Sequence, residues 1–232
     1  CTAKAADEAA KNGCLNVLRD LREHGILCRA RDRADVAAKA GQLEIVRELR
    51  LHGIHCTEEG ADTAATRGYA EVVQDLLAHG ILCSFSAIDR AAGGGHVEVI
   101  CVARAHGIII PGSAADSAAK NGQLGMVRVL RSYGIHCTPL GAKHAAQHAH
   151  WAVVRDLRAH GIDCTSAANY AASVGNLNMV RSLQAHDIYC TSESVIERFY
   201  TVTCMCSVIY ALMVSFVAVA ALIWLRGTVN WS

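Results

Sequence analysis

Histidine and cysteine recur together at a spacing that resembles part of a metal site. Four H-x-x-x-C pairs occur: His24/Cys28, His52/Cys56, His79/Cys83 and His160/Cys164. Zinc needs four nitrogen or sulfur ligands around one point. Equivalent residues of stacked helices lie roughly 8–10 Å apart, so each pair supplies only two ligands. We therefore expect no metal site and no cofactor, with buried, reduced cysteines and histidines that cap helix C-termini.

Aspartates form a second regular series. They occupy one repeated position, which Lys143 and Asn169 take later in the chain: Asp7, Asp35, Asp62, Asp89 and Asp116. A catalytic carboxylate pair requires two acids in one cleft with different environments, which a series of equivalent residues does not provide. We interpret these residues as first-turn aspartates that the helix dipole stabilises and that bond to local amides.

Arginines form two further series, three positions apart on one helix face. They are Arg19, Arg47, Arg128, Arg155 and Arg181, followed by Arg22, Arg50, Arg104, Arg131 and Arg158. Glu44, Glu71 and Glu98 precede this region by one helical turn. We expect a solvated face with weak ion pairs of roughly 0.2–0.5 kcal/mol each. The alternative is a surface for an anionic partner, such as phospholipid headgroups or nucleic acid.

Variable residues flank a nearly constant Ala-Ala pair, and these are the candidate partner-binding residues. Before the pair stand Glu8, Val36, Thr63, Arg90, Ser117, His144 and Tyr170, and after it Lys11, Lys39, Thr66, Lys120 and Gln147. Gly93 takes the second position in one repeat. Variation inside a fixed frame fits either recognition or unconstrained surface drift.

These residues are positioned by a tandem repeat that covers residues 1–192. Gly-Ile-x-Cys or a close variant ends each of seven units, 2–28, 29–56, 57–83, 84–110, 111–137, 138–164 and 165–190. Because the chain opens with Cys1-Thr2, as at Cys56-Thr57, we expect it to begin within an array.

Each unit is predicted to form two short helices. In unit 57–83 the stretch Ala61–Arg67 is rich in alanine, Gly68 interrupts it, and Ala70–Ala78 carries apolar residues at helical spacing. Gly80 is expected to end the second helix in the left-handed conformation. Neither helix buries its apolar stripe alone, so the prediction is an all-α solenoid of stacked helix pairs.

The second helices resemble those of ankyrin repeats. The resemblance rests on Gly41–Arg47 (GQLEIVR), Gly95–Ile100 (GHVEVI), Gly122–Arg128 (GQLGMVR) and the closing Ala78-His79-Gly80, and it covers residues 2–190. The sequence of the repeat units is also similar to that of ankyrin-like arrays of giant DNA viruses of amoebae. The units are shorter than the family's 33 residues and lack its Thr-Pro-Leu-His motif, which implies that the projecting hairpin finger is reduced to a tight loop. The resemblance implies that the first helices line a concave recognition face.

The C-terminal segment, residues 193–232, is of a different kind. Phe199–Leu225 carries no charge and is flanked by Arg198 and Arg226. A helix of that length covers roughly 40 Å, more than the ~30 Å hydrocarbon core of a bilayer. We expect a transmembrane helix that anchors a cytoplasmic array, and the alternative is a helical cap on the solenoid.

The composition limits the classes of function that we expect for this chain. In 232 residues, 22 Lys and Arg against 21 Asp and Glu give a net charge of +1, which argues against a nucleic-acid binder. No nucleophile–base set or phosphate loop is evident, so the chain is not expected to be an enzyme. The leading hypothesis is a non-catalytic protein-interaction scaffold. The alternative is a structural component of a virion or other assembly, whose repeats pack against copies of themselves.

Overall fold

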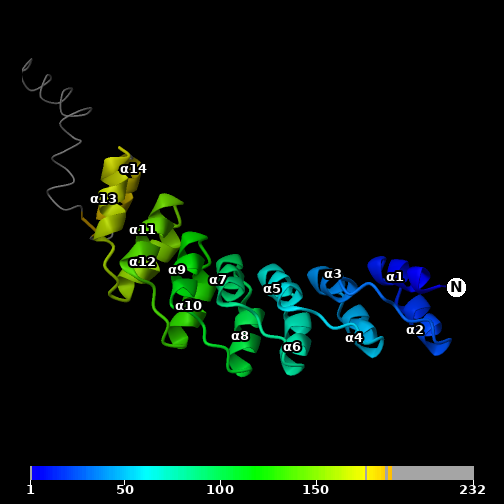
Figure 1. Cartoon of the computed structure of the whole chain (residues 1–232). Helices are drawn as coiled ribbons and strands as arrows, with labels where there is room; N and C mark the ends of the chain where they lie inside the picture. The colour runs from blue at the N-terminus through cyan, green and yellow to red at the C-terminus, as the bar shows by residue number, and fades with distance from the viewer. Residues whose placement is uncertain (1, 176, 186–187, 190–232) are drawn as a thin grey trace, which may run out of the picture. The chain divides into compact units, whose positions relative to one another are not determined.

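A computed structural model describes residues 2–175, 177–185 and 188–189, and every regular element in that part of the chain is an α-helix (Figure 1). The first helices of the repeats are α1 (Ala3–Lys11), α3 (Arg33–Lys39), α5 (Glu58–Arg67), α7 (Phe85–Gly94), α9 (Ser113–Lys120), α11 (Pro139–Gln147) and α13 (Thr165–Ser173). The second helices are α2 (Leu15–Glu23), α4 (Leu43–Leu51), α6 (Ala70–Ala78), α8 (Val97–Ala105), α10 (Leu124–Ser132), α12 (Trp151–Ala159) and α14 (Leu177–Gln184). The predicted all-α class is confirmed.

The chain divides into two compact units, Cys1–Cys164 and Thr165–Ser232. In the first unit, each first helix packs on the next first helix, from α1 to α11. The second helices make a separate layer beneath them (Figure 1). In the second unit, α13 packs against α14.

Small residues form the core of the first-helix layer. In α5, Ala64 and Ala65 have no exposed surface, while α6 buries the larger Val73 and Leu76. Helix α5 begins at Glu58, three residues before the predicted start at Ala61. The acidic Glu58 and Glu59 lie in its first turn, where the helix dipole favours negative charge.

A left-handed residue links the two helices of each pair. Gly68 has φ +84°, and a Cβ added there would lie 2.4 Å from Nδ1 of His96 in the next repeat. At the equivalent position Ala149 has φ 59°, and it is the only non-glycine residue with positive φ in the described chain. Gly80, with φ +79°, follows the end of α6 as predicted.

The aspartate series joins neighbouring repeats, which corrects the prediction of local amide bonding. Asp116 accepts hydrogen bonds from the amide (2.8 Å) and the hydroxyl (2.6 Å) of Thr138, the N-cap of α11. Asp35 does the same with Thr57, at 2.7 Å for both bonds. Asp7 accepts from the Cys28 thiol at 2.8 Å and from the next two backbone amides. Each of these carboxylates therefore fixes the start of the following repeat.

The arginine series is likewise more than a solvated face. In three places, two arginines of one second helix hold a buried acid of the next, an arrangement that we call an arginine clamp. The clamps are Arg19 and Arg22 with Glu48, Arg47 and Arg50 with Asp75, and Arg128 and Arg131 with Asp156. Their acid side chains are only 4–8% exposed. The weak surface pairs that we expected are represented by Arg47 and Glu44, 3.1 Å apart.

The contact between α6 and α8 uses apolar residues instead. The clamp positions there hold Gln74, Leu77 and Val102, and Leu77 is buried. Between α8 and α10, Arg104 lies over the Tyr133 ring at 4.2 Å, and Cys101 Sγ lies 3.3 Å from the Tyr133 hydroxyl. One helix frame thus accommodates three kinds of contact between second helices.

Six residues, 79–84, connect α6 to α7, and no strand occurs in the described part of the chain. Within the residues that the structure describes, no helix is long and apolar enough to cross a membrane. Phe199–Leu225, the predicted membrane helix, lies outside the described residues.

Candidate functional site

The predicted partner-binding residues all lie on first helices. They are Glu8 and Lys11 on α1, Val36 and Lys39 on α3, Thr63 and Thr66 on α5, Arg90 on α7, Ser117 and Lys120 on α9, His144 and Gln147 on α11, and Tyr170 on α13 in the second unit. None of them is buried, although each flanks a buried alanine pair. The structure therefore places the variable positions of the first unit on the outer surface of its first-helix layer.

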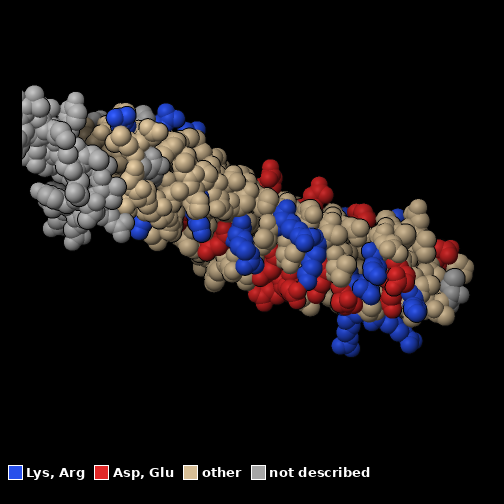
Figure 2. Space-filling view, turned by 90° about the horizontal axis from the view of Figure 1, so that it is seen from above, with Lys and Arg blue, Asp and Glu red and all other residues tan. Residues whose placement is uncertain are grey.

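Charge is unevenly distributed over this unit. Viewed from above, acidic and basic side chains are interspersed from the end that carries α1 to the middle of the stack, while charged side chains are sparser further along (Figure 2). Lys11 lies 3.9 Å from Glu8, and Lys39 lies 2.5 Å from Glu59 of the next repeat. These two lysines are thus paired with acids.

A shallow groove of about 260 Å³ lies between α7 and α9 on this layer. Its walls are formed by Ser86, Asp89, Arg90 and Gly93 of α7 and by Ser117 and Lys120 of α9. At one end, Asn121 donates a hydrogen bond to the Gly93 carbonyl at 3.0 Å. Three predicted residues therefore meet in one depression that offers both hydrogen-bonding and cationic groups.

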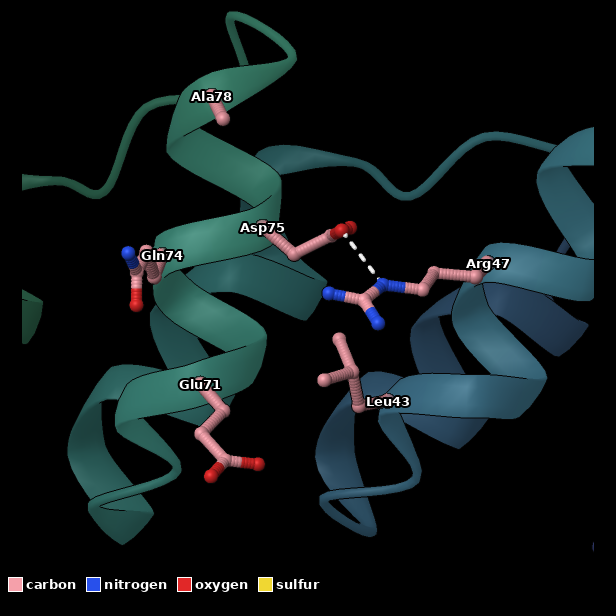
Figure 3. A pocket seen from close by; sticks show the side chains of 6 residues that line it. All are labelled: Leu43, Arg47, Glu71, Gln74, Asp75 and Ala78. Carbon is pink, nitrogen blue, oxygen red and sulfur yellow. Dashed lines mark hydrogen bonds and ion pairs between the residues drawn. The ribbon is translucent and has the colours of Figure 1, made fainter.

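A second groove, of about 470 Å³, lies between α4 and α6 (Figure 3). Leu43 and Arg47 of α4 and Glu71, Gln74, Asp75 and Ala78 of α6 line it, and the Asp75 and Arg47 side chains point toward each other. Burial raises the pKa of Asp75, but the hydrogen bonds from Arg50 and Arg47 outweigh that effect and leave the pKa below its usual range. Because the Asp75 carboxylate is already held on both oxygens, we assign this groove a structural role.

Five cysteines of the repeated series are buried, as expected for small apolar residues: Cys28, Cys56, Cys83, Cys137 and Cys164. Burial raises the pKa of the Cys56, Cys83 and Cys137 thiols to about 12. Within the described residues, no group of three or more His, Cys, Asp or Glu side chains could hold a metal ion.

Histidines occupy the C-cap of most second helices, as predicted, but with two different hydrogen-bond patterns. His79 Nδ1 lies 2.7 Å from the Asp75 carbonyl, and its Nε2 lies 2.9 Å from the Arg50 guanidinium. Since arginine only donates, Nε2 accepts and Nδ1 carries the proton. His52 differs because its side chain is fully buried and its Nδ1 accepts from the Cys28 amide at 3.1 Å.

The cross-repeat acids Glu48, Asp75 and Asp156 were missed by sequence reasoning. Each stands 28 or 29 residues after the first arginine of its clamp, so a search for acids one repeat later would have found them. In comparisons with known proteins, no family model and no curated sequence matches this chain.

Proposed function

We propose that the chain is a non-catalytic protein-interaction scaffold built as an ankyrin-like solenoid. Variable side chains on a constant frame carry this proposal. In α5, the buried Ala64 and Ala65 lie beside the accessible Thr63 and Thr66, and α9 repeats this arrangement around Ala118 and Ala119 with Ser117 and Lys120. A fixed core with a changeable surface allows partner choice to vary without altering the stack.

Selection of binding peptides tests this function. The full chain, kept in a nonionic detergent, is presented to a displayed library of random peptides. We expect selected peptides to lose at least tenfold in affinity for a variant with Arg90→Ala, His144→Ala and Tyr170→Ala. The matched control carries Glu71→Ala and Glu98→Ala, two exposed positions on second helices. If the peptides bind equally to the triple variant and to the control, the three substituted side chains do not carry recognition.

A structural component that packs against its own copies is the second candidate. Three exposed apolar side chains at the loops and adjoining helix start favour it: Leu82 (60% exposed), Phe85 (61%) and Ile109 (74%). Apolar groups left in water favour association. Sedimentation of the full chain in detergent distinguishes the two functions, because a concentration-dependent assembly that Ile109→Ser abolishes supports the structural component.

We further propose that Phe199–Leu225 anchors the array to a membrane and that the array lies in a reducing, cytosolic compartment. The uncharged length of the segment and the many thiols of the array support this placement. The full chain should stay with membranes during carbonate extraction. Placing arginine at Val214 should impair insertion, because a charge at the bilayer centre costs a few kcal/mol.

A further inference from the structure

Lys120 differs from the equivalent lysines of two other repeats. Lys11 and Lys39 lie near the acids Glu8 and Glu59, respectively. At the positions that correspond to those acids, Ser117 precedes Lys120 and Leu140 follows it in the next repeat. Within the described chain, the Lys120 ammonium makes no ion pair or hydrogen bond. Its charge is therefore available to a ligand.

Arg90 brings a second cation to the same groove without an acid of its own. Its Nε donates to the Thr66 hydroxyl at 3.2 Å, and its Nη1 donates to the Ser86 hydroxyl at 2.8 Å. These neutral partners orient the guanidinium without neutralising it. The acid of the groove, Asp89, accepts on both oxygens from the Ser113 hydroxyl, at 2.9 and 2.7 Å.

Gly93 leaves its part of the groove wall without a side chain, and a Cβ added there would lie 2.9 Å from Nδ2 of Asn121. The equivalent positions carry Lys39, Thr66, Lys120 or Gln147, whose side chains would occupy the groove. Leu140, which is 53% exposed, takes the place in the next repeat that Glu59 holds beside Lys39. The groove thus combines a guanidinium held by two hydroxyls, the ammonium of Lys120 and the carboxylate of Asp89, and Leu140 stands in the next repeat at the position equivalent to Glu59.

We propose that this groove binds an acidic peptide segment of a partner protein, with a carboxylate between Arg90 and Lys120 and an apolar side chain against Leu140. The inference rests on the proposed scaffold function and names the chemistry of its ligand. Charge-assisted hydrogen bonds to carboxylates are strong and directional, which suits an arginine held in place. Nucleic acid fits less well, because its affinity comes from many phosphate contacts and this groove offers two cations beside Asp89.

The test uses peptides selected on the full chain in detergent, resynthesised with a fluorescent label and titrated by anisotropy. We expect the selected sequences to be enriched in Asp or Glu next to an apolar residue. Arg90→Gln and Lys120→Gln should each weaken binding about tenfold, whereas the control Lys4→Gln, at an exposed lysine of α1 outside the candidate set, should change it less than twofold. Gly93→Thr introduces the residue of α5 and should weaken binding without changing the net charge. Circular dichroism checks that each variant keeps its helices.

The outcomes separate this proposal from the scaffold function. If the peptides bind equally to Arg90→Gln, Lys120→Gln and the wild type, the groove is not their binding site and this proposal is overturned. Their binding would still support the scaffold function. A library that yields no binding peptide counts against both. A labelled single-stranded oligonucleotide provides the second comparison. If it binds as tightly as the peptides and loses affinity in the same variants, the groove binds phosphate and the peptide proposal is overturned.

Discussion

Thr138 is bonded on two sides, because its hydroxyl donates to Asp116 of the preceding first helix and accepts from the Leu140 amide of its own helix, at 2.6 and 3.2 Å. One side chain therefore caps α11 and joins it to α9. The loss of Thr138 would therefore remove both the cap and the contact between the two repeats.

Removing this connection should destabilise the first unit. We expect Asp116→Ala to lower the free energy of unfolding by about 1–3 kcal/mol, because the Thr138 amide and hydroxyl lose their acceptor. Urea unfolding followed by circular dichroism measures the effect. Asp20→Ala, at a side chain that is 69% exposed, serves as the control and should cost less than about 0.5 kcal/mol.

The clamp at Asp75 can be exchanged for the apolar contact found one repeat later. Asp75→Val alone should cost about 3–5 kcal/mol, because it leaves Arg47 and Arg50 without their acid. Adding Arg47→Gln and Arg50→Leu reproduces the residues of the α6–α8 contact and should restore stability to within about 1 kcal/mol of the wild type. A triple variant no more stable than the single one would show that the two contacts are not interchangeable.

The two left-handed positions should respond in opposite directions. Gly68→Ala should destabilise the fold by about 1–2 kcal/mol through its backbone conformation, and further through the close approach of His96. Ala149→Gly should stabilise it by up to about 1 kcal/mol, since glycine adopts positive φ without strain. Thermal unfolding of both variants beside the wild type measures this difference.

His52 should make stability depend on pH. Burial, the largest effect, keeps its pKa below the ordinary 6.5, against the opposing influence of Glu48, and Arg22 adds to the lowering. The folded state then binds fewer protons, so stability is full above pH 6.5 and falls as the pH drops toward the folded value, by at most about 1.4 kcal/mol per pH unit. Urea unfolding between pH 7.5 and 5 should show a weaker dependence for His52→Gln.

The exposed His24 provides the control for this experiment. Its pKa is raised by the Asp20 carbonyl first and then by the Asp20 carboxylate. It therefore contributes stability that is present below pH 6.5 and is lost as the pH rises through its folded pKa. His24→Gln should not reduce the loss of stability on acidification.

Native thiols should differ in reactivity according to burial. Cys14 and Cys101 are exposed, whereas Cys28 is buried, donates to Asp7, and has a pKa raised to about 12 by burial and by that bond. Among the seven cysteines that the structure describes, we expect iodoacetamide at neutral pH to label Cys14 and Cys101 first, because the thiolate is the reactive form. Peptide mapping by mass spectrometry identifies the sites. Disulfides that join the buried cysteines would contradict the structure.

The helix pairs could be predicted because their signals are local. Gly68 and the apolar spacing of Ala70–Ala78 act within one turn or two, and the structure has α6 at those bounds. The bond between Asp116 and Thr138 spans 22 residues, and local reasoning therefore mistook it for bonding to neighbouring amides. It depends on how closely α9 and α11 stack, which the alanines permit.

The candidate site shows the same division between local and long-range signals. The accessibility of Arg90 and Lys120 follows from their places beside an alanine pair, and it agrees with the structure. The groove between them needs Gly93 and the neighbouring repeat together. The burial of His52 could not be predicted either. The same His-Gly-Ile sequence occurs at His79, whose side chain is 46% exposed. Only the packing of neighbouring repeats distinguishes the two histidines.

The aspartate bonds and arginine clamps described above each join consecutive helix pairs, which has a consequence for how the first unit loses its structure. Cooperativity in such a stack depends on nearest neighbours alone, so the pairs at an end can fray while those further along stay folded. We expect hydrogen exchange to reveal partly unfolded species rather than a single all-or-none event. Substitution of Asp7 and substitution of Asp116 should then unfold different parts of the first unit.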